Sequence, residues 1–193
     1  MNKKYDFAKV EEKWQKASTF YDQKNFFSAM TLIKEILSIN SNHDQSIQLQ
    51  AELIDRFDQA EQFYNEIKLG IKDQKGDLKK LLELLKEAIA IYSDHPAGVL
   101  IQHKLIVLSE RYKIYLEKGN QAIEKHKLEE ALYLFQKAKK IESGSEVLDR
   151  RIELLLTIKN MRGQIEENLS KRHFNQSRRL AHLIDLKISE IKK

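Results

Sequence analysis

The 193-residue chain is 41% apolar and 33% charged, with one proline and six glycines, so its composition favours long helices and argues against a sheet protein, which needs turn residues at every hairpin. It contains no cysteine, which excludes disulfide bonds, thiolate metal sites and a cysteine nucleophile. The net charge of +5 comes from the last 35 residues, which carry nine basic and four acidic side chains, and this excludes a uniformly basic protein with general affinity for polyanions.

The N-terminal segment MNKKYDFAKVEEKWQK is polar, and no run in the chain approaches the roughly 18 apolar residues of a membrane span. We therefore expect a cytoplasmic protein that makes no membrane contact. The sequence leaves open whether the chain is a fragment of a larger protein.

Four segments carry the same apolar stripe at helical spacing, and they begin in chain order at Phe26, Leu78, Leu128 and Phe174. In the first three segments the stripe consists of Phe26, Ala29, Met30, Ile33, Ile36 and Ile39; of Leu78, Leu81, Leu82, Leu85, Ala88 and Ile91; and of Leu128, Ala131, Leu132, Phe135, Ala138 and Ile141. The fourth copy is weaker because Arg178 stands where the others have Met or Leu, which suits a terminal repeat without a neighbour to cover it. Each stripe predicts a short amphipathic helix with its apolar side in the core.

The segments between these short helices, approximately residues 44–74, 97–125 and 145–172, contain no proline and have apolar residues throughout. We expect each segment to form one long helix of about 40 Å, at 1.5 Å per residue. The alternative is an additional short helix in each segment, since each contains a glycine that weakens a helix, at Gly70, Gly119 and Gly163.

Capping residues predict where some of the helices begin. Ser41 with Asp44, and Ser143 with Glu146, have the serine-x-x-acid spacing that satisfies the free amides of a first helical turn. Gly76 predicts the end of one helix just before the next begins.

The residues Gly119, Leu128, Ala131, Phe135 and Ala138 match the signature of the tetratricopeptide repeat (TPR), so the chain resembles that family. The resemblance implies an all-α fold, a right-handed solenoid of alternating long and short antiparallel helices, in which small residues let paired helices approach closely. It also implies a single domain over residues 1–193, with repeat units at approximately 5–41, 44–93, 96–142 and 145–193.

Three features depart from the family pattern. The stripes begin 52, 50 and 46 residues apart, whereas the family repeat is about 34 residues long. Ser41, Ser93 and Ser143 stand where the family has a proline at the helix end, and Trp14 lies one residue from the family's tryptophan position. The long period is the reason that we expect one helix of each pair to be extended.

No pattern in the sequence points to catalysis, to a cofactor or to a metal. There is no glycine-rich phosphate loop, no serine nucleophile elbow and no HExxH motif, and no two of the six histidines have the three- or four-residue spacing that directs both at one metal. We expect a non-enzyme without cofactor, whose histidines are exposed or cap loops.

Stacked helical repeats leave an extended surface, so we expect a protein-interaction scaffold that binds a peptide, a helix or a subunit in a helical groove. The candidate partner-binding residues are Lys113, Asn120 and Glu124. Asn120 matches one position of the carboxylate clamp of chaperone-binding TPR proteins, but Leu116 stands where the clamp needs lysine, so we do not expect that activity.

The basic C-terminal end is a second candidate surface, formed by Lys171, Arg172, Arg178, Arg179 and Lys187. Interspersed aromatic and imidazole rings suit stacking on bases, so a nucleic-acid-associated protein is the first alternative function. A solvated end of the solenoid explains the same charges without any ligand. Self-assembly into a homo-oligomer through the end repeats is a further alternative.

Overall fold

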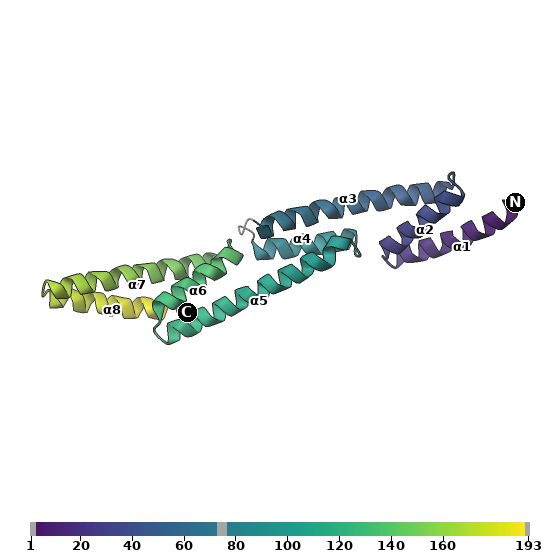
Figure 1. Cartoon of the computed structure of the whole chain (residues 1–193). Helices are drawn as coiled ribbons and strands as arrows, with labels where there is room; N and C mark the ends of the chain where they lie inside the picture. The colour runs from purple at the N-terminus through teal and green to yellow at the C-terminus, as the bar shows by residue number, and fades with distance from the viewer. Residues whose placement is uncertain (1–2, 73–76, 192–193) are drawn as a thin grey trace. The chain divides into compact units, whose positions relative to one another are not determined.

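The computed structural model describes residues 3–72 and 77–191, and within these ranges the chain consists of helices joined by short turns, without strands. The helices are α1 (Lys3–Asp22), α2 (Phe26–Ile39), α3 (Asp44–Lys72), α4 (Leu78–Ile91), α5 (Pro96–Glu124), α6 (Leu128–Ile141), α7 (Glu146–Ser170) and α8 (Phe174–Ile191). Figure 1 shows them as a series of antiparallel hairpins. The all-α prediction is confirmed.

The four short helices begin at the four residues predicted from the apolar stripes. The long segments are single helices: α3 and α5 have 29 residues each and α7 has 25, or about 43 and 38 Å at 1.5 Å per residue. They pass through Gly70, Gly119 and Gly163 without a break, so the alternative of an additional short helix is wrong.

The chain divides into two compact units. The first contains α1 to α3, α4 from Lys79 and the start of α5 as far as Leu105, and the second contains α5 from Ile106 with α6, α7 and α8, together with Asp77 and Leu78. α5 contributes residues to both units.

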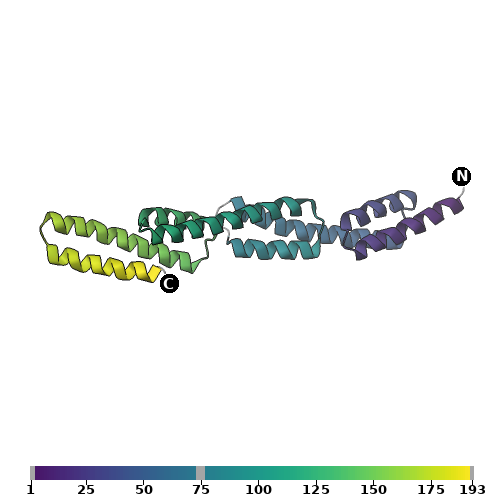
Figure 2. The ribbon, with the colours of Figure 1, turned by 90° about the horizontal axis from the view of Figure 1, so that it is seen from below.

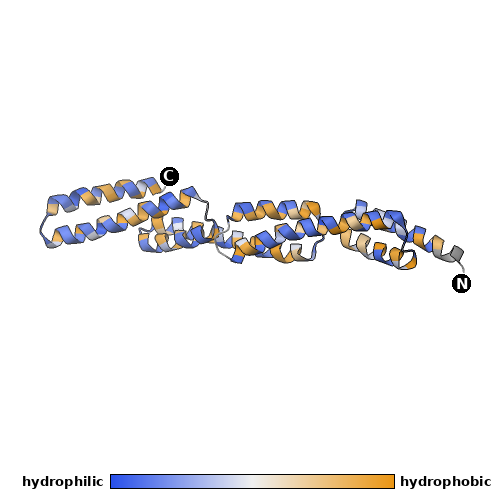
Figure 3. Ribbon diagram, turned by 90° about the horizontal axis from the view of Figure 1, so that it is seen from above, coloured by the Kyte–Doolittle hydropathy of each residue, from blue (hydrophilic) through white to orange (hydrophobic). Residues whose placement is uncertain are grey.

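In the first unit, α2 packs between α1 and α3, and α4 packs against the C-terminal half of α3. The predicted stripes are largely buried, although Ile39 at the end of α2 is exposed. Figure 3 shows hydrophobic and hydrophilic residues alternating along the helices. Aromatic rings extend this core: Phe26 lies 5.1 Å from Tyr92, and Phe57 lies 5.5 Å from Tyr92, between ring centroids.

In the second unit, α6 packs against α5 and α7, and α7 pairs with α8 along its length (Figure 2). Phe135 of α6 is fully buried and lies directly against Gly119 of α5. The core also contains residues of all four helices: Ala122, Ile123, Leu128, Ala131, Leu132, Leu134, Ala138, Leu148, Leu155, Ile158, Ile184, Ile188 and Ile191.

One turn geometry recurs before α2, α6 and α8. The residues with positive φ are Lys24, His126 and Arg172, at 59°, 56° and 60°. The next residue in each turn donates its N–H to the carbonyl five residues earlier, at 2.8 Å in all three cases. This is the Schellman pattern that ends a helix. The predicted stop at Gly76 lies outside the described residues.

The long helices begin two residues later than the serine pattern predicts. His43 Nδ1 accepts a hydrogen bond from the Ser46 N–H at 3.2 Å, and Ser145 Oγ accepts one from the Leu148 N–H at 3.3 Å. The predicted caps at Ser41 and Ser143 are therefore wrong, because the acceptor in the residue just before the helix satisfies the free amides. His95 caps α5 in the same way, since its Nδ1 accepts from the Ala97 N–H at 3.1 Å.

Candidate functional site

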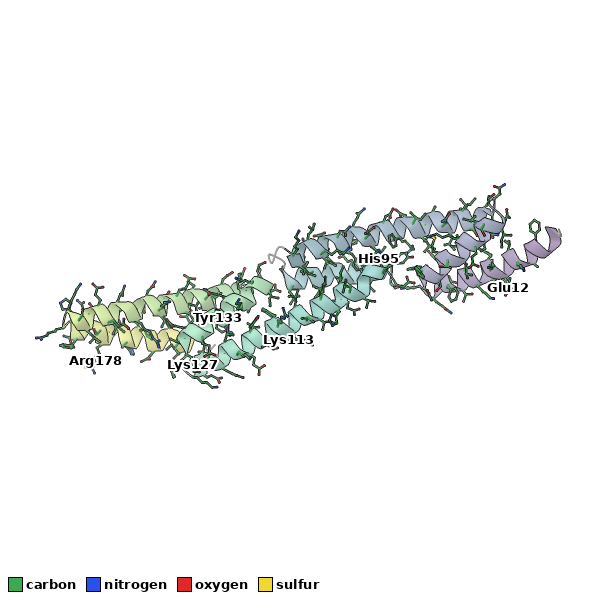
Figure 4. All side chains as sticks on the ribbon, in the orientation of Figure 1. Glu12, His95, Lys113, Lys127, Tyr133 and Arg178 are labelled. Carbon is green, nitrogen blue, oxygen red and sulfur yellow. The ribbon has the colours of Figure 1, made fainter. Side chains whose placement is uncertain are left out.

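Two of the three predicted partner-binding residues line one cavity. Asn120 and Glu124 of α5, together with Ile123, Arg151 of α7 and Ile191 of α8, enclose about 260 Å³, and we name this space the Arg151 cavity. Lys113, which Figure 4 labels, is exposed on α5 but does not line the cavity. The structure thus brings two of the three predicted residues together in one cavity and leaves Lys113 outside it.

Arg151 is held in place from two directions. Its Nη1 donates a hydrogen bond of 2.9 Å to Oδ1 of Asn120, and its guanidinium lies 5.5 Å from the centroid of the Phe135 ring. A cation over an aromatic face is favourable, and the guanidinium carries five N–H groups, of which this bond uses one. Arg151 is therefore a fixed cationic donor at the edge of the cavity.

The rest of the cavity is mixed in character. Ile123 and Ile191 form an apolar floor, being buried in the core, while Glu124 adds a carboxylate on an exposed turn of α5. An arginine, an amide and a carboxylate around an apolar floor suit a short peptide segment, which offers complementary charges, backbone groups and a small apolar side chain.

Sequence reasoning missed Arg151, although the repeats contain a signal for it. Arg151 and Ile101 occupy the same position, five residues after the starts of α7 and α5. Ile101 is buried, so an arginine at the matching place of α7 is a polar departure from the preceding long helix. The partner of Arg151 is 31 residues away in sequence, which is why helical spacing alone does not reveal the pair.

The basic residues of the C-terminal end do not form one group. Lys171 and Arg172 lie in the turn between α7 and α8, with Arg178 and Arg179 on the adjacent part of α8, and all four are exposed. Figure 4 labels Arg178. Lys171 pairs with Glu167 at 2.6 Å, which lowers the pKa of that carboxyl. Lys187 is half-buried and lies about 13 Å further along α8, at 1.5 Å per residue.

Two other cavities in the second unit were not predicted. The larger, about 310 Å³, lies between α6 and α7, with core residues as its floor and the Lys159–Glu129 ion pair, 3.8 Å, at its rim. The smaller, about 240 Å³, is lined by Lys118, Gln121, Ala122, Lys125, Lys127 and Glu130.

His95 of the first unit is a structural residue. Its ring is buried and stacks on Phe57 at 4.4 Å and on Tyr64 at 4.7 Å between centroids, and burial lowers the pKa of the imidazole. Burial, with the nearby Asp94 charge, also raises the pKa of Tyr92 to about 12. These rings pack a helix junction and keep neutral forms at neutral pH. The predicted role of histidines as loop caps is confirmed for His43 and His95.

Within residues 3–72 and 77–191, no three His, Asp or Glu side chains lie together in a way that would hold a metal ion. A search of the same residues finds no helix that combines the length and the apolar character needed to cross a membrane. Comparison of the chain with protein-family models, with curated protein sequences and with solved structures finds no match.

Proposed function

We propose that the chain is a TPR-like right-handed α-solenoid that acts as a non-catalytic, cytoplasmic scaffold and binds a peptide or helix of a partner protein at the Arg151 cavity. The repeated turns support the solenoid, since the same hydrogen bonds recur at Lys24, His126 and Arg172. The small residue Gly119 against Phe135 is what the TPR resemblance implies for paired helices.

The observation that carries the binding function is the fixed position of Arg151. Its contacts with Asn120 and Phe135 order the side chain before a partner arrives, which reduces the entropy lost on binding. Arginine is enriched among the residues that dominate interface energy. The cavity has no nucleophile with an adjacent base, so binding fits its chemistry better than catalysis.

The test is affinity capture from cell extract with the whole chain as bait, quantified by mass spectrometry. We expect a protein that is retained by the wild type and lost at least about tenfold with Arg151→Gln, the effect of losing roughly 1.4 kcal/mol of binding free energy. Lys113→Gln is the matched control, because Lys113 lies on α5 outside the cavity. Equal retention of every captured protein by all three baits would contradict the proposal.

A second candidate function is nucleic-acid binding at the turn between α7 and α8. Phe174 is 63% exposed beside Lys171, Arg172, Arg178 and Arg179, which places an aromatic ring among cations. Labelled single-stranded RNA should then bind with an affinity that falls with salt, and Arg178→Ala should reduce the slope of log K against log salt by about 1. A salt-independent affinity would exclude this candidate.

A further inference from the structure

Two short helices of the earlier hairpins, α2 and α6, are covered on two sides. α2 packs between α1 and α3, and α6 packs between α5 and α7. On α6, the side that meets α7 includes Leu128 and Leu132, which share a cavity with Leu155 and Ile158 of α7. The N-terminal half of a following long helix therefore completes the burial of a short helix.

Among residues 3–72 and 77–191, no second long helix covers α8 in this way. α8 packs against α7, and its last turn meets α5 at the Arg151 cavity. The positions on α8 that match Leu128, Leu132 and Phe135 are Phe174, Arg178 and Ala181, and all three are exposed. We name these three residues the α8 face. Its positions match those with which α6 packs in the core, but a cation replaces the central apolar residue.

The charge around the α8 face indicates which helix fits it. Residues 171–187 contain five basic side chains and one acidic side chain. An amphipathic helix with an acidic excess would therefore be attracted to this surface and oriented by it.

α3 is such a helix. Residues 44–61, the N-terminal part of α3, contain five acidic side chains and one arginine, whereas the corresponding parts of α1, α5 and α7 carry at least as many basic as acidic residues. Ile47 and Ile54 are 44% and 48% exposed, and Asp58 and Glu61 continue the same exposed stripe at spacings of four and three residues. We name these four residues the α3 face.

We propose that the α8 face of one copy packs against the α3 face of a second copy, with Phe174 against the isoleucines and Arg178 opposite the carboxylates. Because the two faces differ, the contact is heterologous, and each copy in a pair keeps one face for a further copy. This surface is separate from the Arg151 cavity, so the proposal does not depend on the function proposed there.

The test is the mass of the full chain in solution, measured by light scattering and sedimentation over a concentration series. The wild type should exceed the 22.7 kDa of one chain as concentration rises and return to it at high salt, because charge attraction is screened. Arg178→Glu with Arg179→Glu should remain monomeric, and so should Asp58→Lys with Glu61→Lys. These residues are exposed, and circular dichroism should show unchanged helix content.

Mixing the two monomeric variants gives the decisive result. The intact α3 face of one variant can meet the intact α8 face of the other, and the two altered faces carry reversed, complementary charges, so the mixture should assemble above the mass of one chain. A chain that carries both pairs of substitutions should assemble again. Lys118→Glu with Lys125→Glu, which changes the charge equally at the lysine-lined cavity, should assemble like the wild type.

A wild type that stays monomeric at every concentration would overturn the proposal. This holds even if the Arg178→Glu, Arg179→Glu variant loses affinity for RNA, since that result would support nucleic-acid binding at α8 instead. A mixture of the two variants that remains monomeric would also overturn it, as would assembly that is lost equally in the lysine-cavity control. None of these outcomes bears on the capture experiment with Arg151→Gln, so the two proposals fail separately.

Discussion

Gly119 brings α5 and α6 so close together that a β-carbon at this position would lie 2.5 Å from Cε1 of Phe135. The ring is fully buried, so a shift of the ring would disturb its neighbours in the core. Gly163 is also within a long helix, but a β-carbon there would meet nothing within 4 Å. Although both glycines lie within long helices, replacing them by alanine should therefore change the stability in opposite directions.

We expect Gly119→Ala to lower the free energy of unfolding by about 1–3 kcal/mol, because it overpacks the core. Gly163→Ala should raise it by about 0.5–1 kcal/mol, because alanine loses less backbone entropy than glycine in a helix. Urea denaturation of the two variants gives both values. A stabilising Gly119→Ala would show that α5 and α6 are not in close contact at this residue.

His95 predicts a dependence of stability on pH. Burial lowers the pKa of its imidazole in the folded chain, so the unfolded chain binds the proton more tightly. The stability that His95 contributes is full above its unfolded pKa of about 6.5 and is lost as the pH falls from there through the folded pKa. The charged groups that act on the His95 imidazole are those of Glu61, Lys68 and Asp94, and the rings of Phe57 and Tyr64 pack against it.

His95→Asn keeps an acceptor for the Ala97 N–H and removes the titration. Chemical denaturation between pH 7 and pH 5 should show a smaller loss of stability in this variant than in the wild type. Identical slopes for wild type and His95→Asn would contradict the assigned burial.

At the scale of the helices, much of the structure could be predicted because the signals are local. An apolar stripe with a period of 3.6 residues fixes where a short helix begins, as at Leu128. The caps at His43 and Ser145 were missed because several neighbouring residues in each turn, Ser41 and His43 or Ser143 and Ser145, carry an acceptor suited to a helix start. The Arg151 cavity was predicted only in part, because it joins residues of three helices.

Alanine substitutions at Phe135 and Phe174 test whether α6 is more deeply buried than α8. Phe135 is fully buried, so Phe135→Ala should lower the free energy of unfolding by about 3–5 kcal/mol. Phe174 is 63% exposed, so Phe174→Ala should change it by less than about 0.5 kcal/mol. Thermal melts at low protein concentration compare the stabilities of the two variants. A large loss of stability from Phe174→Ala would show that α8 is covered by another helix.

At the scale of the whole molecule, the chain has two units with separate cores. In repeat proteins, stability is close to a sum of local terms and contacts between neighbours. A destabilising substitution in the second unit should therefore lower the stability of the first unit less than it would if both units shared one core.

Hydrogen exchange of the Phe135→Ala variant measures this spread. Amides of α6 and α7 should exchange faster than in the wild type, whereas those of α1 and α2, in the first unit, should keep most of their protection. A uniform loss of protection from α1 to α8 would mean that the chain unfolds as a single cooperative body.

The three left-handed residues have a practical use in spectroscopy. A positive φ brings a residue's amide proton close to its own α-proton, which gives a strong intraresidue cross-peak in a nuclear Overhauser spectrum. Lys24 lies in the first unit, and His126 and Arg172 lie in the second. In a spectrum crowded by overlapping helical signals, these three peaks would report separately whether each of their hairpins is formed.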